Sequence, residues 1–172
     1  MTINAPSADP CAGLSIGQTC TGGAIYAGTG YGDGLTATDK YMVTPSDITG
    51  GTRAWATGTY ATSSTGATDL SNGKANTATI VALASTTPAA LACSDLDYGG
   101  YTDWFLPAKN ELSTVLFANR TALGGFAVGS TATYWSSSEG GTTSAWRHSF
   151  GSNAQININK TVNARVRCVR TY

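Results

Sequence analysis

The sequence predicts a disulfide-stabilised α+β domain, with two or so helices and a small antiparallel sheet. Three observations support this class. Short strands come first, helices follow, and apolar residues then alternate with a period of two towards the C-terminus. The 172 residues have the length of one domain. The four cysteines show no C-x-x-C spacing, which argues against a zinc ribbon or a redox dithiol.

The cysteines also suggest how the chain is divided. We predict an N-terminal arm or disulfide loop over residues 1–20 and one domain over residues 21–172. The simplest pairing joins Cys11 to Cys20 and ties Cys93 to Cys168. In the chain-entropy model the long bridge would stabilise the fold by roughly 4 kcal/mol and the short one by roughly 2.5 kcal/mol. Four buried free thiols are the alternative.

The first third of the sequence reads as short strands between turns. We expect strands at 24–27, at 41–44 before Pro45, and at 53–56. The stretch 57–69 is rich in Thr, Ser and Gly, so we expect a surface loop there.

The middle third has helical character. Good helix formers fill residues 75–83. Thr87 can cap a second helix that has Pro88 at its first position and ends near Leu96, which places Cys93 on a helix.

A third helix is expected after Pro107, because Leu112, Val115 and Leu116 then fall on one face.

The last third alternates between apolar and polar residues. We expect strands at 134–138, 145–150, 155–159 and 162–169. In the third of these the isoleucines would face the core and the amides would face solvent.

Composition excludes some classes of partner. Charged residues make up only 12% of the chain and the net charge is zero, so no long-range field would attract nucleic acid. No apolar run approaches the roughly 20 residues that span a bilayer, so membrane insertion is not expected. Residues 1–10 do not resemble a signal peptide. Either a leader has been removed, or the protein leaves the cell without one, as a phage structural protein does at lysis.

The sequence offers few candidates for catalysis. His148 is the single histidine, and it shares a strand face with Trp146 and Phe150. A triad or a metal site is possible in principle, but a hydrogen-bonded core histidine fits this pattern better. Ser136 and its neighbours lack the G-x-S-x-G context of a hydrolase elbow. We therefore predict that the protein is not an enzyme.

No cofactor is predicted, with calcium as the alternative because many lectins hold sugar hydroxyls through it. The lectin sugar motifs Glu-Pro-Asn, Gln-Pro-Asp and Trp-Asn-Asp are absent, and the acidic residues are scattered. These residues are Asp95, Asp97, Asp103, Glu111 and Glu139. We expect Asp103 and Glu111 to fix loops, or to pair with an arginine among Arg165, Arg167 and Arg170.

A row of neutral amides is the candidate binding surface. It could be an ordinary solvated face, or a recognition surface, since exposed amides beside a Trp or an Arg can bind glycan or protein. The surface comprises Asn153, Gln155, Asn157 and Asn159, with Arg147.

An ordered set of segments between Thr21 and Tyr172 resembles one known family. The segments are Gly22–Tyr26, Gly73–Thr77, Gly100–Pro107 with Glu111–Leu112, Tyr134–Glu139, Ala145–Trp146 and Val166–Arg170. They resemble the bacterial and phage domain family typified by the C-terminal domain of the collagen-like adhesin Lcl. The resemblance implies a C-type-lectin-like core shared with the formylglycine-generating sulfatase modifiers.

The resemblance also implies roles for individual residues. It implies that Cys93 bridges to Cys168, which would remove the thiolate that formylglycine-type chemistry needs. It further implies that several residues mainly build the scaffold. These are Trp104, Leu106, Pro107, Glu111, Trp135 and Trp146.

Together these observations predict a non-enzymatic binding or display module. We expect a phage virion surface protein, acting as a decoration, fibre-tip or receptor-binding component. The alternative is a secreted adhesin domain on a bacterial surface that binds glycans. Display gains strength from multivalency, so a homo-oligomer is expected, and the resemblance implies a trimer. Other partners would be virion proteins, or a glycan or protein of the cell surface.

Overall fold

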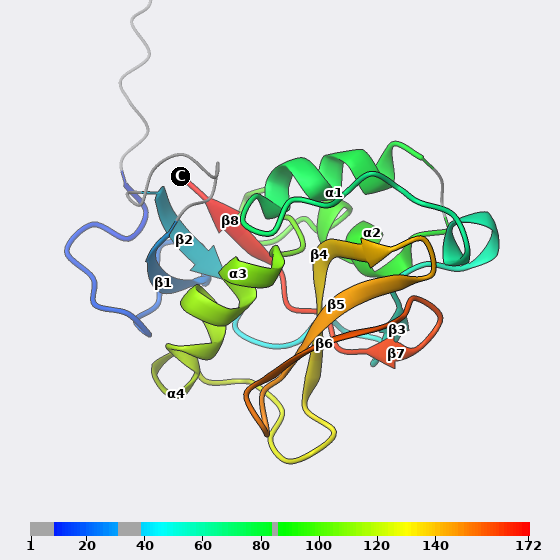
Figure 1. Ribbon diagram of the computed structural model, residues 1–172. Coiled ribbons are helices and arrows are strands. Elements are labelled where there is room, and N and C mark those ends of the chain that lie inside the picture. The colour runs from blue at the N-terminus through cyan, green and yellow to red at the C-terminus, as the bar shows by residue number, and fades with distance from the viewer. Residues whose placement is uncertain (1–8, 31–38, 84–85) are drawn as a thin grey trace, which may run out of the picture.

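The chain folds into small antiparallel sheets with helices packed around them (Figure 1). This computed structural model describes residues 9–30, 39–83 and 86–172. The mixture of helices with antiparallel sheets confirms the predicted α+β class. The described strands form three sheets. In the first, β2 (Asp39–Val43) lies between β1 (Ile25–Gly30) and β8 (Val169–Thr171), and in the second, β3 (Arg53–Ala54) pairs with β7 (Asn163–Ala164). In the third, β5 (Ser144–Ser149) lies between β4 (Thr133–Gly141) and β6 (Ala154–Asn159).

The helices lie mostly in the middle of the chain, as predicted. Asn72 caps α1, because its Oδ1 accepts a hydrogen bond from the backbone N–H of Ala75 at 2.9 Å. Pro88 occupies the first position of α2. The helical segments are η1 (Gly58–Ala61), α1 (Gly73–Val81), α2 (Pro88–Ser94), α3 (Lys109–Glu111), η2 (Leu112–Phe117) and α4 (Arg120–Leu123).

The third predicted helix departs from a plain α-helix. It begins as α3 and continues as η2, a π-helical segment in which the N–H of Ala118 donates to the carbonyl of Ser113. Leu112, Val115 and Leu116 are all buried, as their spacing predicted. The wider turn therefore changes the hydrogen-bond pattern without changing the face that meets the core.

The prediction of one final strand over residues 162–169 is wrong. The structure divides this stretch between β7 and β8, which belong to different sheets. Between them the chain pairs instead with the segment after β2, since the N–H groups of Thr44 and Ile48 donate to the carbonyls of Cys168 and Val166. The side chain of Arg167 is buried there, and its Nε donates to the carbonyl of Thr44. An alternating pattern cannot show where a strand leaves one sheet for another.

Two apolar clusters fill the interior. One surrounds Trp55, Ile80 and Trp135. The other joins η2 to the sheet of β1, β2 and β8 and extends to Tyr134 of β4 and to Phe150 after β5. All four cysteines belong to the first cluster and form the two predicted disulfides, Cys11–Cys20 and Cys93–Cys168. The loop of the short bridge thus packs against the same core as the rest of the chain, while residues 1–8 of the predicted arm lie outside the described residues.

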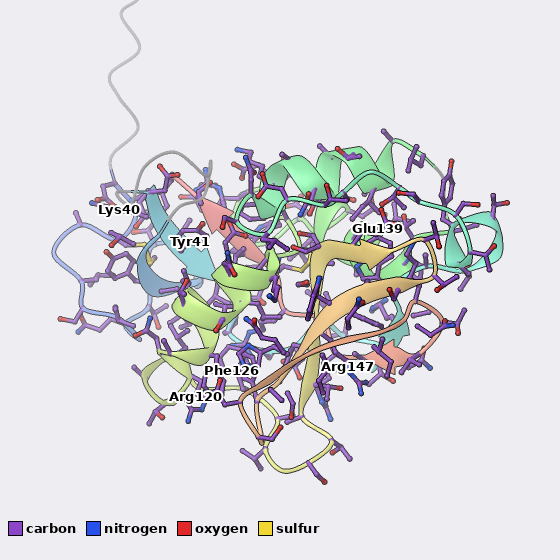
Figure 2. All side chains as sticks on the ribbon, in the orientation of Figure 1. Lys40, Tyr41, Arg120, Phe126, Glu139 and Arg147 are labelled. Atoms are coloured by element: carbon purple, nitrogen blue, oxygen red, sulfur yellow. A yellow bond between two sulfur atoms is a disulfide. The ribbon has the colours of Figure 1, made fainter. Side chains whose placement is uncertain are left out.

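The stretch 57–69 is not simply a surface loop. Ala61, Thr65 and Ala67 are buried, and the loop closes around the carboxylate of Glu139 near the β4–β5 turn (Figure 2). The N–H groups of Thr65 and Gly66 donate to this carboxylate.

Lys160 completes this buried polar cluster. Its Nζ lies 2.5 Å from Oε1 of Glu139, and neither side chain is more than 1% exposed. The ammonium also donates to the carbonyls of Ser63 and Thr142, so its three N–H donors each have an acceptor. Burial acts to raise the pKa of Glu139, but Lys160 and the N–H donors outweigh it and hold that pKa below its ordinary value.

Glu111 holds backbone segments in place rather than pairing with an arginine, which is the first of its two predicted roles. Its carboxyl group accepts hydrogen bonds from the hydroxyl of Tyr41 at 2.7 Å and from the N–H groups of Ala108 and Gly73. Burial raises the pKa of Glu111 to about 8, although these donors act in the opposite direction. Asp103 does pair with an arginine, Arg170.

Glu111 should make stability depend on pH. Between pH 4.5 and about 8 the folded protein keeps a proton on Glu111 that the unfolded chain has released. The free energy of unfolding should therefore fall as pH rises through this window, by up to roughly 1.4 kcal/mol per pH unit. Urea denaturation of the wild type and of Glu111→Gln at several pH values measures the effect. Because the amide cannot ionise, the difference in stability between the two proteins should change in favour of the variant as pH rises. A constant difference would contradict the assignment.

Candidate functional site

The hairpin of β5 and β6 presents the candidate surface. The two strands pair in one unbroken register, from Ser144 opposite Asn159 to Ser149 opposite Ala154. Residues that face each other across an antiparallel pair project on the same side of the sheet, and successive residues alternate. The register therefore decides which of the predicted residues share a face.

Three of the predicted amides lie on one face, and Trp146 joins them. Gln155, Asn157 and Asn159 pair with His148, Trp146 and Ser144 respectively. Asn157 and Asn159 are exposed, and Gln155 and Trp146 are half-buried. The predicted row therefore exists over three residues, with an indole beside its centre.

Lys109 of α3 adds a cation to this face. Its Nζ lies 4.2 Å from the centre of the Trp146 ring, and its backbone carbonyl accepts a hydrogen bond from Nε2 of Gln155 at 3.4 Å. We call the surface formed by Lys109, Trp146, Gln155, Asn157 and Asn159 the amide face. It combines neutral donors and acceptors, an aromatic ring and one positive charge, which suits a polar neutral or weakly acidic ligand.

Gly140 makes room for the centre of the amide face. A Cβ at this position would lie 2.2 Å from Oδ1 of Asn157, so the Asn157 side chain could not lie where it does beside any larger residue.

The other two residues of the predicted surface do not belong to it. Arg147 pairs with Ile156 and so projects from the opposite side of the sheet. Asn153 lies in the β5–β6 turn at a positive φ of 57°, and its Oδ1 contacts Nε2 of His148 at 3.0 Å. Ile156 and Ile158 are half-buried rather than in the core, because β6 is an edge strand.

His148 is a core residue, as predicted. It is 1% exposed, its ring stacks on Phe117 at 4.7 Å between centroids, and Phe150 packs edge-on against it. Burial lowers the pKa of His148, although its contact with Asn153 raises it. Its register opposite Gln155 puts the side chain on the same side of the sheet as the amide face, but there it is buried against Phe117 and held for packing.

The residues assigned to the scaffold are mostly interior. Trp104, Pro107, Glu111 and Trp135 are buried, whereas Trp146 is half-buried and belongs to the amide face. The indole N–H of Trp135 donates to the carbonyl of Arg53 at 2.8 Å, which ties β4 to β3.

A hollow of about 430 Å³ lies at the other end of the hairpin and was not predicted. Phe126 and Phe150 line it together with Arg120, and exposed Val128 stands at its edge. Arg120 and Phe126 lie close to each other in Figure 2, below α3. This hollow offers apolar surface and one guanidinium, so it is a second place where a ligand could bind.

The described residues were also compared with the requirements of a metal site and of a reactive thiol. Within residues 9–30, 39–83 and 86–172, no group of three or more His, Cys, Asp or Glu side chains is arranged to hold a metal ion. All four cysteines are in disulfides. No helix in the described part of the chain is long and apolar enough to cross a membrane.

Comparison with solved structures finds a similar fold in a fimbrial protein from Bacteroides ovatus ATCC 8483, with a TM-score of 0.54 and 16% sequence identity. The match covers 92% of this chain but 45% of the fimbrial chain, so this chain spans less than half the length of that protein. No curated protein sequence matches the chain.

Comparison with family models gives the second finding. The model of the Lcl C-terminal domain matches residues 54–170, about two thirds of the chain. This stretch includes the segments from η1 to β7, the strands of the amide face, and Cys93 with Cys168. The chain therefore belongs to the Lcl C-terminal domain family.

Proposed function

We propose that this protein is a non-enzymatic binding and display domain that contacts its ligand through the amide face. In this proposal it acts on a phage virion surface as a decoration, fibre-tip or receptor-binding component. The finer fold assignment, a C-type-lectin-like domain, is part of the same proposal. The observation that carries it is the row of Gln155, Asn157 and Asn159 beside Trp146 on a rigid hairpin.

The chemistry of the amide face supports binding rather than catalysis. Its side chains offer amide donors and acceptors, an indole and an ammonium group, all of which recognise polar ligands without reacting with them. Strands hold these groups more firmly than a loop would, so little conformational entropy is lost when a ligand binds. His148 and Glu111, two groups with shifted pKa values, are almost completely buried, so neither is available to a ligand at this surface.

A secreted adhesin domain that binds glycans is the second candidate. Two observations favour it: the family is named after the C-terminal domain of Lcl, and a similar fold occurs in a fimbrial protein. Both candidates place the chain on a surface, and both use the same face. They differ in the ligand: the phage candidate would bind the surface of a bacterial cell, whereas the adhesin would bind glycans of another organism.

Binding of the labelled protein to a panel of bacterial cells, and to an array of purified bacterial and animal glycans, tests the proposal. For any cell or glycan that binds the wild type, Trp146→Ala and the double variant Asn157→Ala/Asn159→Ala should each weaken binding at least about tenfold. Their melting temperatures should stay within a few degrees of the wild type, because these side chains are exposed or half-buried.

Lys74→Ala, an exposed position on α1, is the matched control and should bind like the wild type. Arg120→Ala tests the hollow instead. If Arg120→Ala abolishes binding while Trp146→Ala leaves it unchanged, the hollow is the ligand site and the amide face is not. Binding to cells alone supports the phage candidate, and binding to animal glycans supports the adhesin.

A further inference from the structure

The outer edge of β6 is unpaired within the part of the chain that the structure describes. β6 is the last strand of the order β4–β5–β6, and its only described ladder is with β5. That ladder runs over six residues without a bulge, whereas the β4–β5 ladder has shifts on either side of Glu139. The edge is therefore regular over its whole length.

The backbone groups that point outward can be identified from the ladder. The N–H of Lys160 donates to the carbonyl of Thr143 at 3.0 Å, so these two residues form a hydrogen-bonded pair. Along an antiparallel ladder, every second pair is hydrogen-bonded. Counting back from Lys160, the backbone groups of Ile158 and Ile156 therefore bond to β5. The backbone groups of the residues between them must then point away from the sheet.

The contact between β4 and β5 agrees with this assignment. The N–H of Phe150 donates to the carbonyl of Ala132, so even-numbered residues of β5 hydrogen-bond to β4 and odd-numbered ones to β6. The outward groups of β6 are accordingly those of Gln155, Asn157 and Asn159. Of these, the carbonyl of Asn159 already accepts from the N–H of Val162 at 3.1 Å.

This edge lacks the usual protection against pairing. Exposed edge strands are commonly blunted by a charged side chain, a proline or a bulge. β6 reads Ala-Gln-Ile-Asn-Ile-Asn and contains none of these. A row of outward-pointing N–H and C=O groups on an uncharged strand is a template for another strand.

The order of side chains indicates which strand fits. From Gln155 to Asn159, amide side chains alternate with isoleucines. The order of side-chain types is therefore the same whether it is followed from Asn157 towards the N-terminus or towards the C-terminus. Antiparallel pairing with a second copy would then set Asn157 opposite Asn157 and Ile156 opposite Ile158. We propose that the outer edge of β6 pairs antiparallel with β6 of a second copy of this chain, about a two-fold axis through Asn157.

The pairing would satisfy the outward groups and extend the sheet. The two Asn157 residues would exchange N–H···O=C bonds, and the N–H of Asn159 would donate to the carbonyl of Gln155 in the other copy, so that about four backbone hydrogen bonds form. On one face amides would meet amides, which can both donate and accept. On the other, half-buried isoleucines would cover one another.

The symmetry has a consequence for display. An isologous two-fold contact of this kind closes at two copies and makes one continuous sheet of two three-stranded halves. The axis is perpendicular to the sheet, so both amide faces would lie on the same side and could engage one surface together. A strand-to-strand contact buries less than the roughly 1,200 Å² of a stable interface, so the dimer should be weak and depend on concentration.

Sedimentation velocity over a range of concentrations tests the pairing without any ligand. The wild type should shift from the chain mass of 17.6 kDa towards twice that value as concentration rises. Asn157→Lys and Asn157→Asp place like charges against each other at the axis, so each should remain monomeric at every concentration. An equimolar mixture of the two variants should dimerise again, because the lysine of one copy then faces the aspartate of the other.

Controls separate this edge from the rest of the hairpin. Thr143→Lys and Thr143→Asp change an exposed residue of the β4–β5 turn and should dimerise like the wild type. Asn157→Ala stays neutral and keeps the backbone, so it should dimerise even where it no longer binds a ligand. That variant distinguishes failure of this proposal from failure of the proposed function. A wild type that stays monomeric or forms trimers, or a mixture of charged variants that does not dimerise, would overturn the pairing.

Discussion

Replacing Cys93 and Cys168 together with alanine should lower the free energy of unfolding by about 4 kcal/mol. The bridge closes a loop with a sequence separation of 75 residues, so its loss greatly increases the conformational freedom of the unfolded chain. Both side chains are fully buried, and alanine avoids placing a new hydroxyl in the core. Guanidinium denaturation under non-reducing conditions measures the change.

The short bridge provides the matched control. Cys11 and Cys20 are nine residues apart, so the corresponding double alanine variant should lose only about 2.5 kcal/mol. Mass spectrometry of the unreduced wild type should find all four cysteines without free thiols. Free thiols in the folded protein, or equal losses in the two variants, would contradict this account of the bridges.

Replacing Lys160 with methionine should cost about 3–5 kcal/mol, because the Glu139 carboxylate would remain buried without its cation. The free energy lost comes from the unpaired charge more than from the ion pair as such. The double variant Lys160→Met/Glu139→Gln should therefore lose less than the sum of the two single variants. Chemical denaturation of the four proteins gives this coupling energy.

Hydrogen exchange identifies where the structure loosens. The N–H groups of Thr65 and Gly66 donate to Glu139, so their exchange should accelerate in Lys160→Met. Amides of β1 belong to another sheet and serve as the internal control. If Thr65 and Gly66 exchange at the wild-type rate, the ion pair does not hold the loop of residues 57–69 in place.

Buried ion pairs of this kind are hard to foresee from sequence. Glu139 and Lys160 are separated by a hairpin, and nothing in their spacing sets them apart from the other charged residues of the chain. Glu111 shows the same difficulty, since its hydrogen-bond partner Tyr41 lies 70 residues away. Which charges enter the interior depends on contacts between distant segments, and these exist only after folding.

The candidate site was partly foreseeable. The alternation of residues 155–159 correctly placed Gln155, Asn157 and Asn159 together. A further signal was available, because a short turn between two alternating stretches fixes the register of a hairpin. Counting back from that turn would have placed Trp146 opposite Asn157 and removed Arg147 from the surface.

The sequence by itself determined the α+β class, the positions of α1 and α2 and the hairpin of β5 and β6, because these depend on periodicity and capping residues. The pairing of the cysteines was expected only as the simplest arrangement and from the family resemblance. Only the tertiary structure decided that the last segment is divided between two sheets, that Lys160 is buried against Glu139, and that Lys109 of α3 lies over Trp146. The physical reason is the separation along the chain of the residues that interact. Local patterns act between neighbouring residues, whereas strand partners and buried charges are chosen by packing between segments that the chain brings together only when it folds.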